Sequence, residues 1–192
     1  MDAEAIKKVA HDLLVSHPSR GVKPAALAEV LRSLEINQLE HGEPLCQEGD
    51  PGNSMYFLLQ GSIIVTRIDA DGAERELVTM SAPALIGHMA LVDNSPRSAT
   101  CRAKGATQVA PLERTLYHTI LSESSSRGTA LRRMLLTSLT RQLETATDRL
   151  RRLIAGKRES DTPTESGPTT ERELMNISGV LNGWTDQKST DS

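Results

Sequence analysis

The stretch from Glu35 to Pro111 constrains the fold most, because turn-forming residues break it into short runs at regular intervals. Glycine, proline, asparagine and aspartate separate six runs that have the length and composition of β-strands. These runs are residues 36–39, 55–59, 62–68, 76–80, 98–103 and 107–112. The tetrapeptide Asp69–Gly72 has the composition of a hairpin turn between the third and fourth runs. Many short strands with such turn spacing are typical of a small barrel or roll.

Segments with helical periodicity flank this strand-rich region on both sides. Residues 3–16 place their apolar side chains on one stripe, and Pro24 suits the first turn of a second helix over about 24–34. A shorter helical segment is expected at 114–122, followed by a long helix over about 129–156. The sequence thus predicts a mainly β fold with flanking helices: a double-stranded β-helix (jelly-roll-like) β-roll, with N-terminal helices and a long C-terminal helix.

The predicted organisation has four parts. They are an N-terminal helical segment (1–34), the β-roll (35–126), the long C-terminal helix (127–157) and a tail (158–192). The tail is rich in serine, threonine, proline and acidic residues, a composition that predicts disorder over most of it. An apolar cluster, Leu174–Trp184, interrupts the tail and is either a short binding motif or a segment that docks on its own chain.

Bulk composition argues against several classes of protein. The net charge of −3 gives no reason to expect a membrane or nucleic acid partner for the whole molecule. The N-terminus lacks a signal-peptide pattern, and no apolar run approaches the ~18 residues of a membrane span, so a cytoplasmic location without membrane contact is predicted. Cys46 and Cys101 stand far apart without metal-ligand spacing and are interpreted as free thiols.

The long C-terminal helix carries two surfaces of interest. Its apolar residues from Leu139 to Leu153 form a short heptad-like seam, which packs on the β-roll, pairs with a second copy in a homodimer, or does both over different turns. Its arginines could contact nucleic acid, but a solvated face that complements the helix dipole and the acidic tail explains them more simply. DNA is not an expected partner, because the tail is too short for a helix-turn-helix with its own core.

The segment 86–100 carries the clearest functional chemistry. Gly87 followed by one helical turn presents backbone N–H groups without intrahelical partners, which favours an anion. By strand alternation Arg97 shares a face with small apolar residues, so its guanidinium points inward unless it pairs with an acid such as Asp93 or turns to solvent. Ser98 adds a hydroxyl and an N–H donor. These residues together describe a cradle for one phosphate.

This segment resembles the phosphate-binding cassette of cyclic-nucleotide-binding domains, the family of the catabolite activator protein and the kinase regulatory subunits. The resemblance extends over about residues 30–155. It includes the stretches Gly42–Leu45 and Glu48–Ser62, the hairpin residues Asp71-Gly72, and the cassette end Pro96–Thr100. It implies a β-roll that binds a cyclic nucleotide, here without a DNA-binding domain, and transmits the event through its last helix.

The resemblance also implies a role for each candidate ligand-binding residue. The candidates are Gly87, His88, Met89, Ala90, Arg97, Ser98, Val65, Leu77, Val78, Thr145 and Thr147. The arginine and the serine would hold the cyclic phosphate, and the four residues from Gly87 onward would line the ribose side. The two valines and the leucine would face the purine, and one of the two threonines would contact the base from the long helix.

His88 is the main departure from the family pattern, which usually has glutamate after the cassette glycine to accept the ribose 2′-hydroxyl. A neutral imidazole accepts one hydrogen bond but is not a bidentate anion, so binding is expected to weaken by about 1.5–3 kcal/mol, or roughly one to two decades. The imidazole could also titrate near neutrality, although a neutral, packed histidine is the simpler interpretation. A second departure is Pro83-Ala84, where a Gly-acid turn is common.

The sequence contains no recognisable catalytic constellation. Its five histidines lack zinc-site spacing, and neither a nucleophile elbow nor a P-loop is present. The leading hypothesis is a non-enzymatic regulatory sensor for a cyclic nucleotide, cAMP before cGMP, that acts on an unidentified protein partner or on its own dimer. No metal or other cofactor is expected. The alternative is a β-roll interaction protein that has lost nucleotide binding, and the third option is a truncated transcription regulator.

Overall fold

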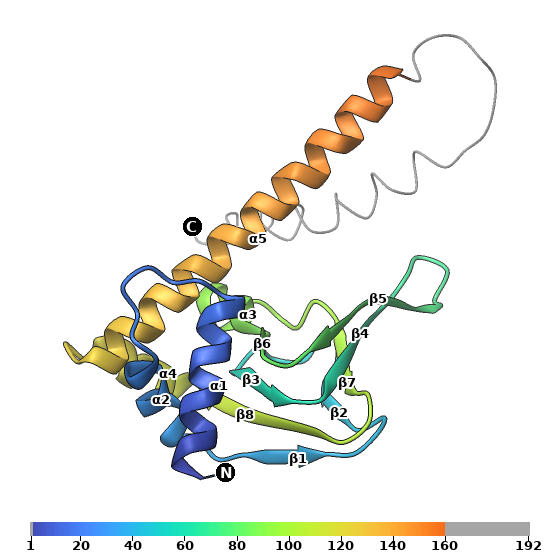
Figure 1. The fold of residues 1–192 in the computed structure, drawn as a ribbon. Helices are drawn as coiled ribbons and strands as arrows, with labels where there is room; N and C mark the ends of the chain where they lie inside the picture. Colours follow the sequence, from blue (N-terminus) through green and yellow to red (C-terminus); the bar gives the residue numbers. More distant parts are fainter. Residues whose placement is uncertain (1, 160–192) are drawn as a thin grey trace, which may run out of the picture. The chain divides into compact units, whose positions relative to one another are not determined.

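The computed structural model describes residues 2–159, and two four-stranded antiparallel sheets form the β-roll (Figure 1). The first sheet has the order β1-β8-β3-β6, with β1 at Asn37–Leu39, β8 at Thr107–Glu113, β3 at Ser54–Gln60 and β6 at Ala84–Ile86. The second sheet has the order β2-β7-β4-β5, with β2 at Pro44–Cys46, β7 at Thr100–Ala103, β4 at Ser62–Ile68 and β5 at Glu74–Ser81. These sheets and their flanking helices confirm the predicted fold class.

Strand β3 contributes to two hydrophobic clusters, because side chains alternate between the faces of a strand. Phe57 packs on one face with helix residues such as Leu27 and Met134. Leu58 packs on the other face with Ile63 of the second sheet. The smaller cluster therefore lies between the two sheets, and the larger cluster lies between the first sheet and the helices.

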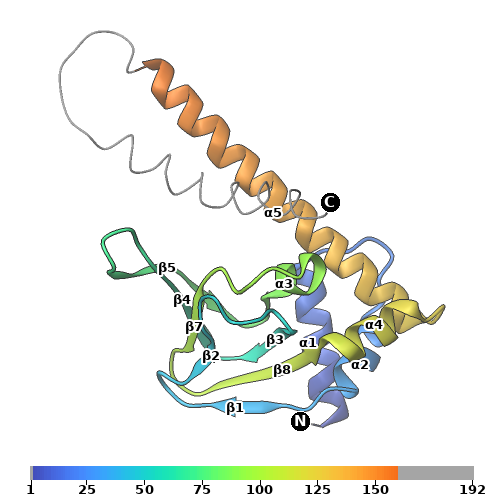
Figure 2. The same ribbon diagram turned by 180° about the vertical axis from the view of Figure 1, so that it is seen from behind.

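The helices have bounds close to the predicted ones. They are α1 (Ala3–Ser16), α2 (Pro24–Arg32), α3 (His88–Asp93), α4 (Arg114–Ser122) and α5 (Ser126–Glu159). The Asp2 carboxylate caps α1 by accepting a hydrogen bond from the Ala5 N–H at 2.7 Å. Figure 2 shows α1, α2 and α4 gathered on one side of the sheets, where the larger cluster is buried.

The predicted hairpin turn joins β4 and β5. The Gly72 N–H donates to the Asp69 carbonyl at 3.0 Å, and the Asp69 side chain accepts from the Asp71 N–H at 2.9 Å. Strands β2 and β6 were not expected from the sequence. Each has only three residues, too few for an alternating pattern to stand out from the surrounding turns.

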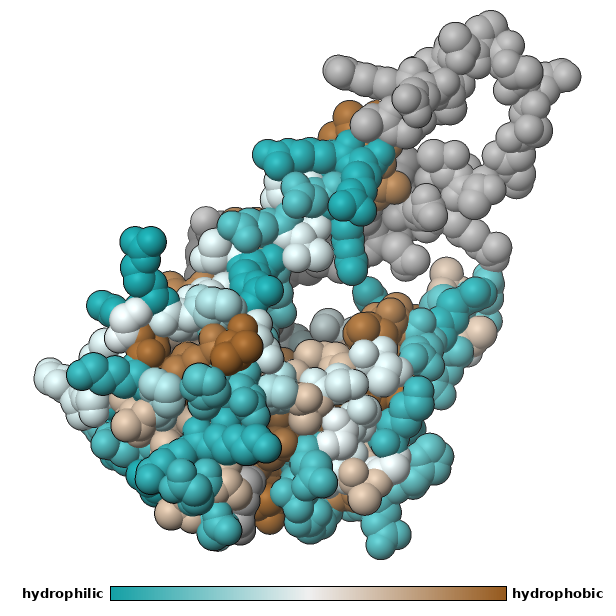
Figure 3. Space-filling view, viewed as in Figure 1, coloured by the Kyte–Doolittle hydropathy of each residue, from teal (hydrophilic) through white to brown (hydrophobic). Residues whose placement is uncertain are grey.

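The chain divides into two compact units, residues 1–145 and 146–192. The β-roll belongs to the first unit, and the predicted four-part division of the chain stays a prediction. The Leu174–Trp184 cluster lies outside the described residues. Within residues 2–159 no helix is long and apolar enough to cross a membrane. Hydrophilic side chains cover much of the visible face of α5 in Figure 3, with apolar ones between them.

Candidate functional site

A cavity of about 200 Å³ opens beside α3, with walls from the second sheet, from the segment that follows α3 and from α5. Seven of the predicted ligand-binding residues line it. They are Val65, Gly87, His88, Met89, Ala90, Arg97 and Ser98. The structure therefore brings the whole predicted cassette together with one predicted residue of β4.

Arg97 is the only buried cation among the described residues, with 6% of its surface exposed. Its Nη1 donates to the Gly87 carbonyl at 3.0 Å, and its Nη2 donates to the Ser54 carbonyl at 2.6 Å and the Ser54 hydroxyl at 3.1 Å. Its guanidinium carbon lies 5.4 Å from the centre of the Tyr56 ring. None of the ion pairs between described residues includes Arg97.

The two alternatives for Arg97, pairing with Asp93 or pointing to solvent, are both excluded by this geometry. The Asp93 carboxylate instead accepts hydrogen bonds from the backbone N–H and the hydroxyl of Ser95. Because neutral oxygens and an aromatic ring surround the buried guanidinium, no carboxylate pairs with it within residues 2–159. Such a charge is costly to bury, and an anionic guest would lower that cost.

Gly87 lets the guanidinium approach the backbone at the start of α3. Its φ is 69°, in the left-handed region that glycine adopts without strain. A Cβ at this position would lie 2.2 Å from the Arg97 Nη1. Glycine therefore suits both the backbone conformation and the close approach of the arginine at this position.

Two further contacts hold the cassette in place. The Arg97 N–H donates to the Asp50 carbonyl at 2.8 Å, while the Arg97 carbonyl accepts from the Gly49 N–H at 2.9 Å. At the other end of α3, Arg114 donates to the carbonyls of Gly52, Ala90 and Leu91. The loop between β2 and β3 thus fixes the backbone of Arg97, and Arg114 ties α3 to the same loop.

His88 is packed inside the structure, with 3% of its surface exposed. Its Nε2 lies 3.0 Å from the Ser138 hydroxyl of α5, and its ring also interacts with the Gln142 side chain, while its buried Nδ1 has no hydrogen bond of ordinary geometry among the described residues. Burial, reinforced by nearby His17, lowers the pKa of His88 to about 4. The imidazole is therefore neutral at pH 7, which supports the packed interpretation over titration near neutrality.

Four predicted residues do not line the cavity. Leu77 and Val78 are about half exposed on β5, and the Thr145 hydroxyl donates to the Arg141 carbonyl of its own helix. Thr147 belongs to the second compact unit. On β5 and α5 the cavity is lined by Met80 and Gln142 instead of the predicted residues.

Sequence reasoning missed Met80, Gln142 and two cysteines of the cavity wall, Cys46 and Cys101. Met80 lies two residues after Val78, so strand alternation alone could have suggested it. Gln142 lies on α5, and nothing in the sequence fixes which face of that helix turns to the cavity. Among the described residues no group of three or more histidine, cysteine or acidic residues could hold a metal ion.

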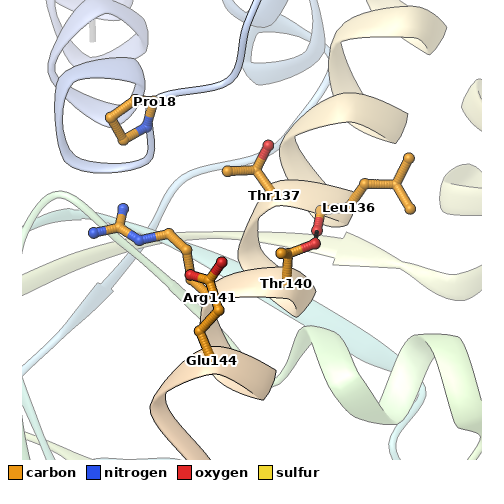
Figure 4. Close-up of a pocket in the computed structure, with 6 residues that line it drawn as sticks. All are labelled: Pro18, Leu136, Thr137, Thr140, Arg141 and Glu144. Carbon is orange, nitrogen blue, oxygen red and sulfur yellow. Dashed lines mark hydrogen bonds between the residues drawn. The ribbon is translucent and has the colours of Figure 1, made fainter. Parts of the chain in front are cut away.

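A second hollow, of about 440 Å³, lies along α5 (Figure 4). Its lining residues are Pro18, Leu136, Thr137, Thr140, Arg141 and Glu144. Its polar groups are largely used within the chain: the Thr140 hydroxyl donates to the Leu136 carbonyl, and Arg141 donates to the Ser16 carbonyl. Since it has no buried charge, the smaller cavity beside Arg97 is the better candidate site.

Comparison with known proteins points to the same region. Residues 36–124 match the family described as "Cyclic nucleotide-binding domain". A cyclic nucleotide-gated potassium channel from Mesorhizobium japonicum is 32% identical over 115 residues, which cover 57% of this chain and 30% of the channel. A CRP-like cAMP-activated global transcriptional regulator from Mycobacterium tuberculosis is 24% identical over 122 residues, which cover 64% of this chain and 54% of the regulator.

A solved structure of the same kind of protein also superposes on this chain. The crystal structure of the Thermus thermophilus catabolite activator protein is 27% identical and superposes with a TM-score of 0.62, covering 70% of this chain and 61% of that one. The chain spans 30% of the channel and 54% of the regulator. The likeness therefore concerns one domain of larger proteins.

Proposed function

Because residues 36–124 form a domain of the cyclic nucleotide-binding family, we propose that this chain is a non-catalytic sensor of a cyclic nucleotide. The observation that carries the proposal is the buried Arg97 guanidinium, which lines a cavity and whose hydrogen-bond partners among residues 2–159 are all neutral. The ligand is cAMP before cGMP, in line with the name of the similar cAMP-activated regulator. A cytoplasmic location stays a prediction from the sequence.

Arg97 has donors to spare for a phosphate. Three of its hydrogen bonds go to neutral oxygens of Gly87 and Ser54, while a guanidinium carries about five N–H groups in a fixed fork. The remaining donors and the Ser98 hydroxyl are available for the equatorial oxygens of a cyclic phosphate. In this arrangement the neutral carbonyls orient the guanidinium and the ligand supplies the missing charge.

The volume of the cavity indicates which part of the nucleotide it holds. At about 200 Å³ the cavity is smaller than the ~300–1,000 Å³ of most small-molecule sites. The phosphate and ribose would occupy it, and the base would lie toward Val65, Met80 and Gln142. The unpartnered His88 Nδ1 would exchange one hydrogen bond with the ribose 2′-hydroxyl, donating or accepting according to its tautomer.

Signal transmission would use the contacts of the cassette with α5. His88 and Ser138 share a hydrogen bond of 3.0 Å, and Gln142 lines the cavity one turn further along the helix. If α5 can adopt two placements against the cassette, a ligand that competes for His88 or engages Gln142 would have a different affinity for each. Such differential affinity is the requirement for a ligand-driven shift in equilibrium.

Calorimetric titration with cAMP and with cGMP tests the proposal. The wild-type chain is expected to bind one of them with a Kd below about 1 mM, and Arg97→Ala is expected to show no heat. Arg102→Ala is the matched control, because Arg102 lies next to Cys101 on β7 and so turns to the opposite face. No heat from a folded wild-type chain at any attainable concentration would overturn the sensor proposal.

The ribose assignment has its own test. His88→Glu restores the carboxylate that the family resemblance implies, and it is expected to raise cAMP affinity by roughly one to two decades. The gain should vanish with 2′-deoxy-cAMP, which lacks the hydroxyl. An unchanged affinity for cAMP in a folded variant would mean that His88 does not face the ribose.

One observation favours a second candidate function. His88 already has a hydrogen bond to α5 and fills the position beside Gly87, as it would in a β-roll that serves only as an interaction protein. This alternative predicts that neither nucleotide binds the wild type. It also predicts that His88→Glu alone does not create binding.

A homodimer through α5 is the second part of the proposal. Leu135 is buried in the larger cluster and Leu139, the first residue of the seam, is half-buried, so this part of α5 packs within its own chain. Leu136 and Leu143, by contrast, are 63% and 69% exposed, one heptad apart. Leu150 continues this spacing and is also exposed. Exposed leucines at heptad spacing favour pairing with a second helix.

A further inference from the structure

The fold brings together the only two cysteines of the chain. Cys46 of β2 and Cys101 of β7 are partners in the register of an antiparallel pair, which shifts by one residue between Pro44 and Cys46. Directly opposed residues in such a pair have Cα atoms about 4.5–5.5 Å apart. This spacing falls within the roughly 4.4–6.8 Å that a disulfide bond requires. The register of the two strands therefore brings the two thiols within reach of a disulfide bond.

The two sulfurs lie in unequal surroundings. Cys46 is half-buried, whereas Cys101 is 5% exposed, and both line the cavity beside Arg97. The Cys46 thiol donates to the Ala99 carbonyl at 4.0 Å, and the neighbouring Cys101 thiol, helped by the charge of Arg97, lowers the pKa of Cys46 to about 7. The same contact, together with burial, raises the pKa of Cys101. At neutral pH a large share of Cys46 is therefore thiolate, while Cys101 keeps its proton.

This arrangement has the parts of a reactive cysteine and its resolving partner. The thiolate is the nucleophilic form of cysteine, and a neighbouring cation favours it. A second thiol at disulfide distance protects the first oxidation product by converting it into a disulfide. Both cysteines line the cavity of about 200 Å³, and the half-buried Cys46 is the more exposed of the two.

We propose that Cys46 and Cys101 form an oxidation site for small hydroperoxides within the cavity, with Cys46 as the attacking thiol and Cys101 as the resolving thiol. This site does not depend on the proposed nucleotide binding. Either one can fail without the other, because the redox test below uses no nucleotide.

The chemistry proceeds in two balanced steps. The Cys46 thiolate attacks the peroxide O–O bond; an S–O bond forms, the O–O bond breaks, and the leaving alkoxide or hydroxide takes a proton from water. The Cys101 sulfur then attacks the Cys46 sulfenic acid; the S–S bond forms, the S–O bond breaks, and the departing hydroxide takes the Cys101 proton to give water. The two thiols lose two electrons in total, and the hydroperoxide is reduced to an alcohol, or to water when it is hydrogen peroxide.

Thiol counting on the full chain tests this site directly, since the sequence contains two cysteines. The reduced protein is treated with a small molar excess of hydrogen peroxide at pH 7.5. Titratable thiols should fall from two to none, the intact mass should fall by two hydrogens, and the chain should stay single on a non-reducing gel. A dithiol reductant should restore both thiols.

Two matched variants separate the roles of the sulfurs. In Cys101→Ser, Cys46 should be trapped as a sulfenic acid that dimedone labels, with a labelling rate that rises through about pH 7. In Cys46→Ser, Cys101 should be oxidised at least about tenfold more slowly, because it is buried and protonated. Thermal unfolding of both variants checks that they remain folded.

Three results would overturn the proposal. One is survival of both thiols in the wild type under conditions that oxidise free cysteine. Another is a disulfide that forms only between chains. The last is equal labelling of the two single-cysteine variants, which would mean that the cavity does not distinguish the sulfurs.

Discussion

A single buried imidazole links the cavity to the acid stability of the protein. His88 keeps a neutral ring because burial lowers its pKa to about 4, whereas the same side chain in the unfolded chain titrates near 6.5. Between these two values the unfolded state binds a proton that the folded state does not. Stability due to His88 is therefore complete above pH 6.5 and falls as the pH decreases toward 4.

The first prediction follows from this loss of stability at acidic pH. Lowering the pH from 7.5 to 4.5 should cost the wild type about 2–3 kcal/mol of unfolding free energy through His88. Over the same pH interval, the unfolding free energy of His88→Gln should fall by about 2–3 kcal/mol less than that of the wild type. Urea unfolding at the two pH values measures the difference, and His11→Gln, at an exposed position of α1, is the control. Equal pH dependence in wild type and His88→Gln would contradict the assignment.

How well individual residues could be predicted depended on the range of the interactions that place them. Gly87, Arg97 and Ser98 were expected at a phosphate cradle, and they line the cavity together because one short segment holds all three. Gln142 was missed because the rotation of α5 is set by distant packing. The contact of Cys46 with Cys101 was missed because it depends on the register of β2, a strand of three residues with no pattern of its own.

At the scale of elements, α1 and α4 were predicted with their observed bounds, since each has a clear apolar stripe and a turn at its end. The helix α5 begins at Ser126, three residues before the expected start, in a serine-rich stretch that the sequence alone favours as a loop. Strand β7 begins at Thr100, two residues after the predicted start, so the strand alternation from which the direction of Arg97 was inferred does not reach that residue. The Arg97 side chain points inward because hydrogen bonds join its backbone to the β2–β3 loop.

The second prediction concerns the junction of β6 and α3. Gly87→Ala should cost about 1 kcal/mol of stability from its positive φ and should also push the Arg97 guanidinium aside. Gly72→Ala is the matched control, because Gly72 also has a positive φ, of 77°, but open space around its Cβ position. Both variants should lose stability in urea, Gly72→Ala from its positive φ alone, and only Gly87→Ala should lose at least about tenfold in nucleotide affinity by calorimetry. Equal affinities would mean that the cavity does not hold the phosphate.

At the scale of the whole molecule, α5 connects the cavity with an exposed apolar surface. Ser138 and Gln142 lie one turn apart on the face that meets the cavity. Leu136 and Leu143 lie on a different face, because residues two and five positions from Ser138 are rotated well away from it at about 100° per residue. A movement of α5 caused by ligand binding at the cavity would therefore also move the exposed leucines.

The third prediction is that the chain forms a dimer that depends on these two leucines. Burying an exposed leucine contributes about 1.5–3 kcal/mol, so the double variant Leu136→Glu/Leu143→Glu should weaken dimerisation at least about 100-fold. Light scattering coupled to gel filtration should give twice the chain mass for the wild type and the single chain mass for this variant. Val15→Glu, which changes an equally exposed apolar residue of α1, should remain dimeric. A wild type that stays monomeric at all attainable concentrations would leave the two leucines without this role, and α5 would then have to act on a different protein.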